Sequence, residues 1–383
     1  MITVAAAGGI AAGPATMTAA EAALVHCAVD NLAAADVTVV GGGPAGFAAA
    51  ITLRNAGAQV LLFEQSRYRH HRVGEILSAR VRTELATLGI EKLPQRMHRE
   101  CVGFRSYWGS AAPDEKAAIC DPYGPAWRVD RRAFDEALCA AAIREGVRVI
   151  PGHRISRRHL AARTWPRRGC VVDATGRAAL VSRAMGARLQ RSDRLIAIWR
   201  VFPTDKPIEP ITLIEATPTG WWYTTTVPSG ALIACHFTDA DLWRAGATWA
   251  AALKDAPSTG RRLPANSGAT PPTITAAHTG RLDRVHGPGW IATGDAAQSR
   301  DPLSGDGVLT ALRSGRLAAQ TLIASGHCGP AVFDAYTTVL DDDWSTYLEL
   351  RQTFYSFENR WADQPFWRRR HTYGDPAASA IPA

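Results

Sequence analysis

Three glycines, Gly41, Gly43 and Gly46, have the spacing of a turn that can hold a dinucleotide pyrophosphate. They follow the apolar run Val37–Val40, which is typical of a parallel strand buried on both faces. The first glycine permits the tight turn, the second lets the backbone approach the pyrophosphate, and the third lets a helix pack closely on the strand. The chemistry that these residues predict is the binding of a dinucleotide.

The elements that must position such a ligand surround the glycines. Phe47–Asn55 is predicted to be a helix that Gly57 ends, with N-terminal amides and a dipole that would face the phosphates. Val60–Phe63 is the second strand, and Glu64 stands at its end, about twenty residues beyond the glycines, where a carboxylate can accept both ribose hydroxyls. Strand, glycines, helix, strand and acid in this order predict dinucleotide binding more specifically than glycines alone.

The 383-residue chain is long enough for two closely joined domains. Its net charge of +8 is spread through the arginines, which favours a solvated basic surface and leaves an acidic peptide or protein partner open. No nucleic-acid motif accompanies the charge, and no segment offers about eighteen uninterrupted apolar residues, so neither a nucleic-acid partner nor a membrane span is expected.

Seven scattered cysteines form no C-x-x-C pair or zinc-finger spacing, which indicates reduced thiols and a cytoplasmic protein. The pair His70-His71 lacks further ligands, so no metal site is predicted. Residues 1–35 are rich in alanine and glycine and lack the basic start of a secretory signal. We interpret them as a disordered or non-native leader.

From Leu195 onward, apolar runs follow one another without intervening helices. Strands are predicted at Leu195–Phe202, Ile211–Ala216, Trp221–Val227 and Ala231–Phe237, with a hairpin turn at Pro228-Ser229-Gly230. They predict a mostly antiparallel sheet, the usual floor of a substrate domain. Leu242–Leu253 is predicted to be one helix, followed by a loop to Pro272.

Dinucleotide-fold character then returns. Cys170–Arg177 and Trp290–Asp295 are both apolar strands that run into a glycine turn. The glycine-rich stretch Asp301–Gly307 leads into a long predicted helix, Val308–Ala324, and Val332–His371 is helical and rich in aromatic residues.

Three of these segments resemble the fingerprints of FAD-dependent monooxygenases of the hydroxybenzoate hydroxylase fold: the glycine turn with Glu64, the Asp173–Gly176 turn, and Gly294-Asp295 with the glycine-rich helix start. The resemblance covers residues 36–324. It implies an α/β fold in which a Rossmann-like FAD-binding domain carries an inserted, mostly antiparallel β-sheet substrate domain and a C-terminal helical region. We expect the FAD-binding domain at 36–100, 128–190 and 278–330, the substrate domain at 101–127 and 191–277, and the helical region at 331–383.

By this resemblance Asp295 would hold a ribityl hydroxyl of FAD, and the amides of Gly305–Val308 would face the flavin pyrimidine edge. A helix N-terminus suits that edge because it stabilises the negative charge of reduced flavin. Arg131, in the pattern Arg131-x-x-Phe134-x-x-x-Leu138, matches the family arginine near the cofactor; the alternative is a surface arginine at a helix start. The full predicted cofactor set is Gly41, Gly43, Ala45, Gly46, Glu64, Gln65, Arg72, Arg131, Asp173, Gly176, Gly294, Asp295, Ser304, Gly305, Gly307 and Val308.

Within this fold, Val73-Gly74-Glu75 and Asp301–Gly305 look like the flavin-dependent tryptophan halogenase branch. Two features depart from it. The W-x-W-x-I-P signature is absent, and the catalytic lysine of halogenases would fall on Arg105, after Phe104. An arginine is a poor substitute, because its planar fork differs from the compact ammonium that guides hypohalous acid.

A closer similarity is to the halogenase-like flavoproteins that mature quinone cofactors, those serving lysine epsilon-oxidase, glycine oxidase and quinohemoprotein amine dehydrogenase. The shared features are Gly220-Trp221-Trp222-Tyr223, Thr238-Asp239, the D-P-L-S-G-x-G turn, and the C-terminal residues Tyr355, Glu358, Arg360-Trp361 and Phe366-Trp367-Arg368-Arg369-Arg370. These flavoproteins are linked to oxygenating a tryptophan of a partner polypeptide.

The function that this resemblance implies is an FAD-dependent monooxygenase that hydroxylates a tryptophan-like group through a flavin C4a-hydroperoxide. The group belongs to a small aromatic molecule, a peptide or a protein; O2 is the co-substrate, and NAD(P)H or reduced flavin from a separate reductase supplies electrons. Three alternatives remain: a halogenase, an FAD-dependent dehydrogenase or reductase, and a flavin-binding maturation partner without turnover. The candidate catalytic residues are Glu75, Arg105, Trp222, Asp301 and Pro302. Trp222 has the alternative of being core.

Overall fold

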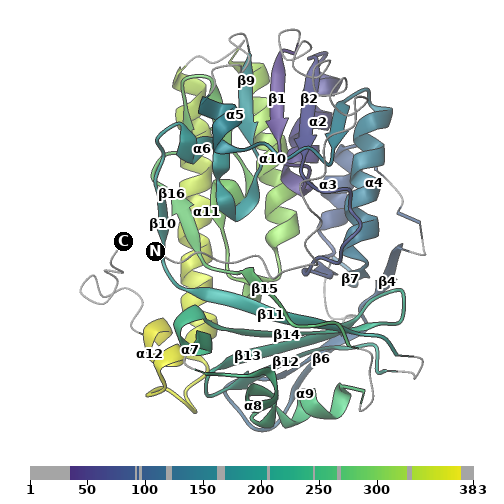
Figure 1. The fold of residues 1–383 in the computed structure, drawn as a ribbon, viewed down its shortest axis with the longest axis vertical. Helices are drawn as coiled ribbons and strands as arrows, with labels where there is room; N and C mark the ends of the chain where they lie inside the picture. The colour runs from purple at the N-terminus through teal and green to yellow at the C-terminus, as the bar shows by residue number, and fades with distance from the viewer. Residues whose placement is uncertain are drawn as a thin grey trace, which may run out of the picture.

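The computed structural model describes residues 35–90, 93–94, 97–117, 123–161, 169–204, 208–244, 246–264, 269–325 and 330–371. Of the predicted leader, only residue 35 is among them. Cys27, Cys120 and Cys328 also lie outside the described residues. Two layers of structure are stacked along the long axis of the molecule (Figure 1). A parallel sheet with helices on both faces forms one layer, and a broad β-sheet forms the other.

The parallel sheet has the strand order β17-β18-β9-β1-β2-β8. Its strands are β17 (His286–Gly287), β18 (Trp290–Ala292), β9 (Cys170–Asp173), β1 (Val37–Val40), β2 (Val60–Glu64) and β8 (Arg148–Pro151). All neighbouring pairs are parallel except β17 with β18. The four residues of β1 are all buried, as the apolar run predicts for a central strand.

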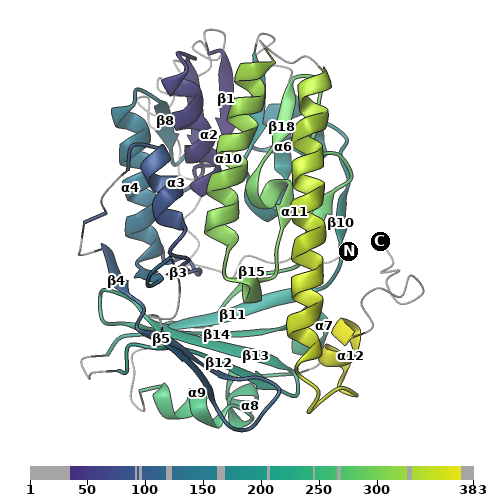
Figure 2. The ribbon, with the colours of Figure 1, turned by 180° about the vertical axis from the view of Figure 1, so that it is seen from behind.

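Helices cover both faces of this sheet. One face carries α2 (Pro44–Asn55), α3 (Val81–Thr87), α4 (Arg131–Arg144) and α10 (Gly307–Ala324), and the other carries α5 (Arg157–Ala161) and α6 (Leu180–Ala184) (Figures 1 and 2). Helices α2 and α10 are in close contact because Gly315 has no side chain: a Cβ there would overlap the Ala45 carbonyl. The predicted Rossmann-like organisation is confirmed.

The second layer is a seven-stranded sheet of order β15-β11-β14-β13-β12-β5-β6. Its strands are β15 (Thr273–Ala276), β11 (Leu195–Phe202), β14 (Leu232–Asp239), β13 (Gly220–Thr226), β12 (Thr212–Thr217), β5 (Gly103–Tyr107) and β6 (Asp114–Ala117). The predicted hairpin turn forms between β13 and β14, where the Gly230 amide donates to the Val227 carbonyl at 2.9 Å. The sheet is antiparallel apart from β12 with β5, so the mostly antiparallel sheet is confirmed.

The two faces of this sheet meet different partners. The inner face packs on aromatic residues of the C-terminal helices, including Tyr355 and Trp367. The outer face is covered by α8 (Trp249–Lys254) and α9 (Pro257–Arg262). The expectation of one helix at Leu242–Leu253 is wrong. The chain instead forms α7 (Ala240–Arg244) and α8, because Gly246 adopts a left-handed φ of +97° and the Thr248 hydroxyl caps α8. Helix α9 also lies in the segment predicted to be a loop.

The C-terminal region joins the two layers. Helix α11 (Pro330–Ser356) runs beside α10 and continues past the seven-stranded sheet to α12 (Pro365–His371) (Figure 2). The Tyr336 hydroxyl donates to the Ala292 carbonyl of β18 at 2.7 Å, and the Trp367 indole donates to the Thr217 carbonyl of β12 at 2.8 Å. The C-terminal helices α11 and α12 therefore contact both sheets.

Two three-stranded sheets complete the fold. One has the order β3-β7-β4 and contains β3 (Ile76–Leu77), β7 (Trp127–Val129) and β4 (His98–Glu100). The other has the order β10-β16-β19 and contains β10 (Leu189–Arg191), β16 (Gly280–Leu282) and β19 (Gln298–Ser299). In the part of the chain that the structure describes, no helix is both long and apolar enough to cross a membrane.

Candidate active site

In the glycine turn between β1 and α2, Gly41 and Gly46 are tightly packed, whereas Gly43 has free space beside it. Gly41 has a φ of +109°, and a Cβ there would overlap the Ala174 carbonyl; a Cβ at Gly46 would overlap the Gly41 carbonyl. At Gly43 a Cβ would meet nothing within 4 Å. The turn thus has the geometry expected if Gly41 and Gly46 serve packing and Gly43 leaves space for a pyrophosphate.

Two uncapped helix N-termini supply free amides. Helix α2 begins after Gly43 and α10 after Asp306, and neither N-cap makes a side-chain hydrogen bond to its helix. Neither first turn contains an acidic residue. A Cβ at Gly305 or Gly307 would meet nothing within 4 Å, so the backbone at the start of α10 is open to a ligand. Both termini can stabilise an anion.

Glu64 ends β2 as the sequence predicts and is 5% exposed. Its carboxylate accepts the amides of Gly42 and Ser66, both at 2.7 Å. Arg72 joins it to α4 by ion pairs with Glu64 at 3.4 Å and with Asp135 at 3.0 Å. Oε1 accepts from both Ser66 and Arg72, whereas Oε2 accepts only the Gly42 amide, so Glu64 is held in place and Oε2 can still accept a ribose hydroxyl.

Asp173 has a local role in the structure. Its buried carboxylate accepts hydrogen bonds from the amide and hydroxyl groups of both Thr175 and Ser182, at 2.7 to 3.1 Å. These bonds fix the turn whose Ala174 carbonyl packs on Gly41. The Asp173 carboxylate therefore shapes the cradle and does not face a ligand directly. Gly176 follows with a φ of +63°.

Asp295 lies after β18 in a short turn with a partly exposed carboxylate. Arg177 forms an ion pair with it at 2.6 Å and also donates to the Arg300 carbonyl at 2.8 Å. Sequence reasoning missed Arg177, although the Asp173–Gly176 motif ends directly before it. Gly294 has a φ of +59°, and a Cβ there would lie 2.7 Å from the Ala45 Cβ, which brings this turn against the start of α2.

The residues present fit an FAD molecule. Glu64 bonds the Gly42 amide inside the glycine turn, and Gly294, directly before Asp295, lies against Ala45 of α2 and Ala311 of α10, so the predicted binding groups come from neighbouring turns. The buried Nε of Arg131 also has no hydrogen-bond partner among the described residues. The remaining predicted cofactor residues are Gln65, which is exposed, and Ser304 and Val308, which are partly buried on either side of Gly305.

The segment Val73–Glu75 is held by Arg131, which is the first residue of α4. The Arg131 guanidinium donates to the carbonyls of Val73 at 3.1 Å and Gly74 at 3.2 Å, and pairs with Asp135 at 3.3 Å. Gly74 has a φ of +101°, and a Cβ there would lie 2.6 Å from Arg131 Nη1. The arginine is only 11% exposed, so the alternative of a surface arginine at a helix start does not hold.

Glu75 is fully buried and faces the inner side of the seven-stranded sheet. Its Oε2 accepts the Gly74 amide at 3.0 Å and the Tyr223 hydroxyl at 3.2 Å. Its Oε1 is buried and has no partner among the described residues. Burial raises the pKa of Glu75 to about 7. Sequence reasoning singled out Glu75 but missed Tyr223, whose contact joins residues 148 positions apart.

Trp222 and Arg105 do not join this group. Strand alternation places both on the outer face of the sheet, away from Tyr223. Trp222 stacks on His236 with ring centroids 4.8 Å apart and packs under α8. Arg105 pairs with Glu115 at 2.6 Å and with Glu209 at 2.8 Å. Trp222 is therefore a core residue. Arg105, which aligns roughly with the catalytic lysine of halogenases, does not lie near Glu75.

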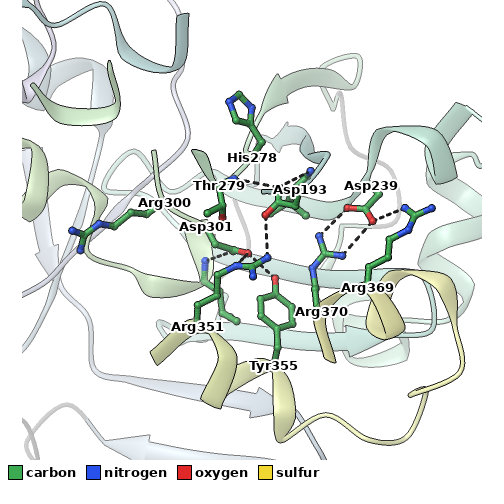
Figure 3. A network of polar contacts seen from close by, with 12 residues as sticks. Asp193, Asp239, His278, Thr279, Arg300, Asp301, Arg351, Tyr355, Arg369 and Arg370 are labelled. Atoms are coloured by element: carbon green, nitrogen blue, oxygen red, sulfur yellow. Dashed lines mark hydrogen bonds and ion pairs between the residues drawn. The ribbon is translucent and has the colours of Figure 1, made fainter. Parts of the chain in front are cut away.

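Asp301 and Pro302 lie where the glycine-rich stretch meets α11. The Asp301 carboxylate is 1% exposed and accepts the Leu303 amide at 3.0 Å and the Tyr355 hydroxyl at 2.8 Å. Arg351 bridges it at 3.4 Å to Asp193, which it contacts at 3.0 Å (Figure 3). With both oxygens engaged, Asp301 positions the loop that leads into α10.

The fold and this cradle define an FAD-dependent oxidoreductase. The tryptophan halogenase family model matches residues 108–380, and the chain belongs to this family. A model of pyridine nucleotide-disulphide oxidoreductases matches residues 35–112, which include the glycine turn. The predicted halogenase-like resemblance and FAD-dependent class are confirmed.

Three known proteins are similar to this chain in sequence or in fold. LodB of Marinomonas mediterranea, named as an FAD-dependent oxidoreductase, is 28% identical over 88% of this chain and 97% of its own length. The myxobacterial chondrochloren halogenase CndH has a similar structure, with a TM-score of 0.74, 20% identity, and coverage of 90% of this chain and 87% of that one. The peptidyl tryptophan dihydroxylase QhpG, essential for tryptophylquinone cofactor biogenesis, gives a TM-score of 0.69, 24% identity, and coverage of 89% and 80%.

Proposed function

We propose that this protein is an FAD-dependent monooxygenase that hydroxylates a tryptophan-like group, held in a partner peptide or protein. The observation that carries the choice of hydroxylation is that the residues described by the structure place no lysine beside Glu75. Arg105, at the expected lysine position, faces outward and is bound to two carboxylates. The two described lysines, Lys116 and Lys254, are exposed on β6 and α8.

The chain contributes binding, orientation and exclusion of water. When bound, FAD would be held by the glycine turn, Glu64, Asp295 and the start of α10, and with O2 and electrons it supplies the oxygen-transfer chemistry. On the inner face of the sheet, the rings of Trp221 and Phe237 stack with centroids 3.9 Å apart and pack under Tyr355 and Trp367 of the C-terminal helices.

The polypeptide form of the substrate is supported by two comparisons. LodB matches nearly the whole chain in sequence, and QhpG, whose name states peptidyl tryptophan as its substrate, matches in fold. Both fit the quinone-cofactor maturation group that the sequence resembles. The electron donor in this proposal is NAD(P)H or reduced flavin from a partner reductase.

Halogenation is the second candidate, and the family match and the fold of CndH favour it. The two functions are separated by supplying FAD-loaded protein with reductant, O2, bromide and tryptophan-containing peptides, and measuring product mass. The proposal expects oxygen and no halogen. An Arg105→Lys variant is expected to leave this unchanged, because its side chain lies on the outer face; bromination by that variant would favour the second candidate.

A further inference from the structure

Glu75 and Tyr223 form a buried polar pair between the segment before β3 and the inner face of the seven-stranded sheet. One carboxylate oxygen, Oε2, is satisfied by the Tyr223 hydroxyl and the Gly74 amide. The other, Oε1, is buried without a partner among the described residues. An unsatisfied buried acceptor is energetically costly, so Oε1 is expected to meet a group that the described residues do not supply.

The surroundings of Glu75 leave its ionisation state adjustable. The cation that faces it is Arg131 from α4, and the titratable neighbours are Tyr223 from β13 and Cys235 from β14. Burial outweighs the stabilising contacts and raises the pKa of Glu75 to about 7. Burial and the carboxyl itself hold the pKa of both Tyr223 and Cys235 well above their ordinary values, so these two keep their protons.

We propose that Glu75 accepts a proton from the aromatic substrate at Oε1, and that Tyr223 positions it. This inference rests on the proposed hydroxylation. The N–H bond of an indole, or the O–H bond of a phenol, breaks and its electron pair moves into the ring, while a new O–H bond forms at Glu75 Oε1. Nothing is oxidised or reduced in this step.

The consequence of the proton transfer is a more electron-rich ring. Such a ring is a better nucleophile toward the electrophilic oxygen that FAD, O2 and reductant supply. A carboxyl whose pKa lies close to the working pH suits this role, because it is ionised in a useful fraction of molecules and still has proton affinity. Tyr223 maintains the geometry by donating to Oε2, which leaves Oε1 for the substrate.

The kinetic test uses FAD-loaded protein and a tryptophan-containing peptide as the probe. Glu75→Gln retains an acceptor for Gly74 and Tyr223 but has no proton affinity. Its kcat is expected to fall about 100-fold or more. The wild-type loss of kcat below a midpoint of about 7 is expected to disappear. Glu84→Gln, which alters a buried glutamate between α3 and α10, is the matched control.

Tyr223→Phe separates positioning from a structural role. The Tyr223 hydrogen bond lowers the pKa of Glu75, so its removal is expected to move the acidic limb of kcat to higher pH. A purely structural role would lower kcat equally at all pH values. Circular dichroism and FAD binding confirm that each variant is folded and loaded.

Infrared difference spectroscopy of the ligand-free protein gives a readout independent of turnover. A protonated-carboxyl band is expected to titrate with a midpoint near 7 in the wild type and to be missing in Glu75→Gln. Oxygenated product formed at full rate by Glu75→Gln, or the absence of the band from the wild type, would overturn the proton step alone. Absence of any oxygenated product from the wild type would overturn the proposed function and the proton step with it.

Discussion

His236 is buried on the outer face of the seven-stranded sheet, and neither ring nitrogen has a partner among the described residues. It stacks on Trp222, with an angle of 20° between the rings. Burial lowers its pKa to about 3. The imidazole of His236 therefore stays neutral in the folded protein. The free energy of unfolding must then depend on pH through this residue.

The sign of this linkage follows from the two pKa values. In the unfolded chain a histidine has a pKa of about 6.5, so below that pH the unfolded state binds a proton that the folded state does not. Stability contributed by neutral His236 is complete above pH ~6.5 and falls by about 1.4 kcal/mol for each pH unit toward ~3. At pH ~5 the loss relative to pH ~7 is about 2 kcal/mol.

His236→Phe is expected to remove that loss while retaining the stacking on Trp222. The free energy of unfolding, measured by urea titration at pH 5 and pH 7, should therefore differ less between the two pH values than in the wild type, by about 2 kcal/mol. His71→Gln, a change at an exposed histidine, serves as the control. An unchanged pH dependence in His236→Phe would contradict the assignment.

The strand that carries Trp221, Trp222 and Tyr223 shows which residue roles the sequence could predict. Because side chains alternate along a strand, Trp222 must lie on the opposite face of the sheet from Trp221 and Tyr223. The sequence does not state which face meets the cofactor domain. The structure puts Trp221 and Tyr223 inward and Trp222 outward. Glu75 was predictable from its motif, whereas its partner Tyr223 depends on tertiary packing.

At the scale of elements, the β1–α2 turn separates folding from cofactor binding. Gly46→Ala would drive a Cβ into the Gly41 carbonyl, whereas Gly43→Ala would place its methyl in open space. The φ of Gly43 is −93°, which alanine adopts without strain. We therefore expect Gly43→Ala to fold normally and lose FAD affinity, and Gly46→Ala to lose stability.

Thermal unfolding of the cofactor-free proteins and FAD titration by fluorescence quenching measure these two effects. Gly43→Ala should unfold within about 2–4 °C of the wild type, the shift that ~1 kcal/mol produces in a large chain, because its methyl group meets no atom within 4 Å. Tight FAD binding by Gly43→Ala would contradict the placement of the pyrophosphate at this turn.

The connection between α11 and the loop before α10 depends on a buried ion pair. Arg351 is 4% exposed and lies between Asp301 and Asp193. Arg351→Met would leave both carboxylates buried without this cation, at a cost of about 3–5 kcal/mol. Tyr355→Phe removes the hydrogen bond to Asp301 and the one accepted from the buried Trp221 indole, and should cost about 1–3 kcal/mol.

Chemical denaturation of these variants provides the measurement. Arg105→Met, which breaks ion pairs with the half-exposed Glu115 and Glu209, is the matched surface control and is expected to cost at most about 1 kcal/mol. Equal losses in Arg351→Met and Arg105→Met would show that the buried network does not hold the two elements together.

The bounds of single helices and strands were easier to predict than the pairing of strands that are distant in the sequence. The strand Leu195–Phe202 has the predicted bounds, and the long helix starts one residue before the predicted Val308. The parallel pairing of β5 with β12 was not predictable, because it joins segments about one hundred residues apart through backbone bonds that carry no side-chain signal. Gly246 was the available signal for the break between α7 and α8.

In the whole molecule, the cofactor cradle lies in one layer and the stacked rings of Trp221 and Phe237 lie in the other, with α11 contacting both layers through Tyr336 and Tyr355. The three fingerprints predicted the first layer because glycine turns and acids recur at defined spacing. In our proposal the second layer contributes Tyr223 to the choice of reaction, and the side chains of this layer follow no comparable spacing. Glu75 lies where the two layers meet and bonds to Tyr223 across the junction.

The measurement that tests the central claim most directly is the mass of the product under isotopically heavy O2. FAD-loaded protein, a reductant, bromide and a tryptophan-containing peptide are combined, with boiled protein and an anaerobic sample as controls. We expect the peptide to gain oxygen, the gain to carry the heavy isotope, and bromide not to be incorporated. A brominated peptide, or turnover that persists without O2, would contradict it.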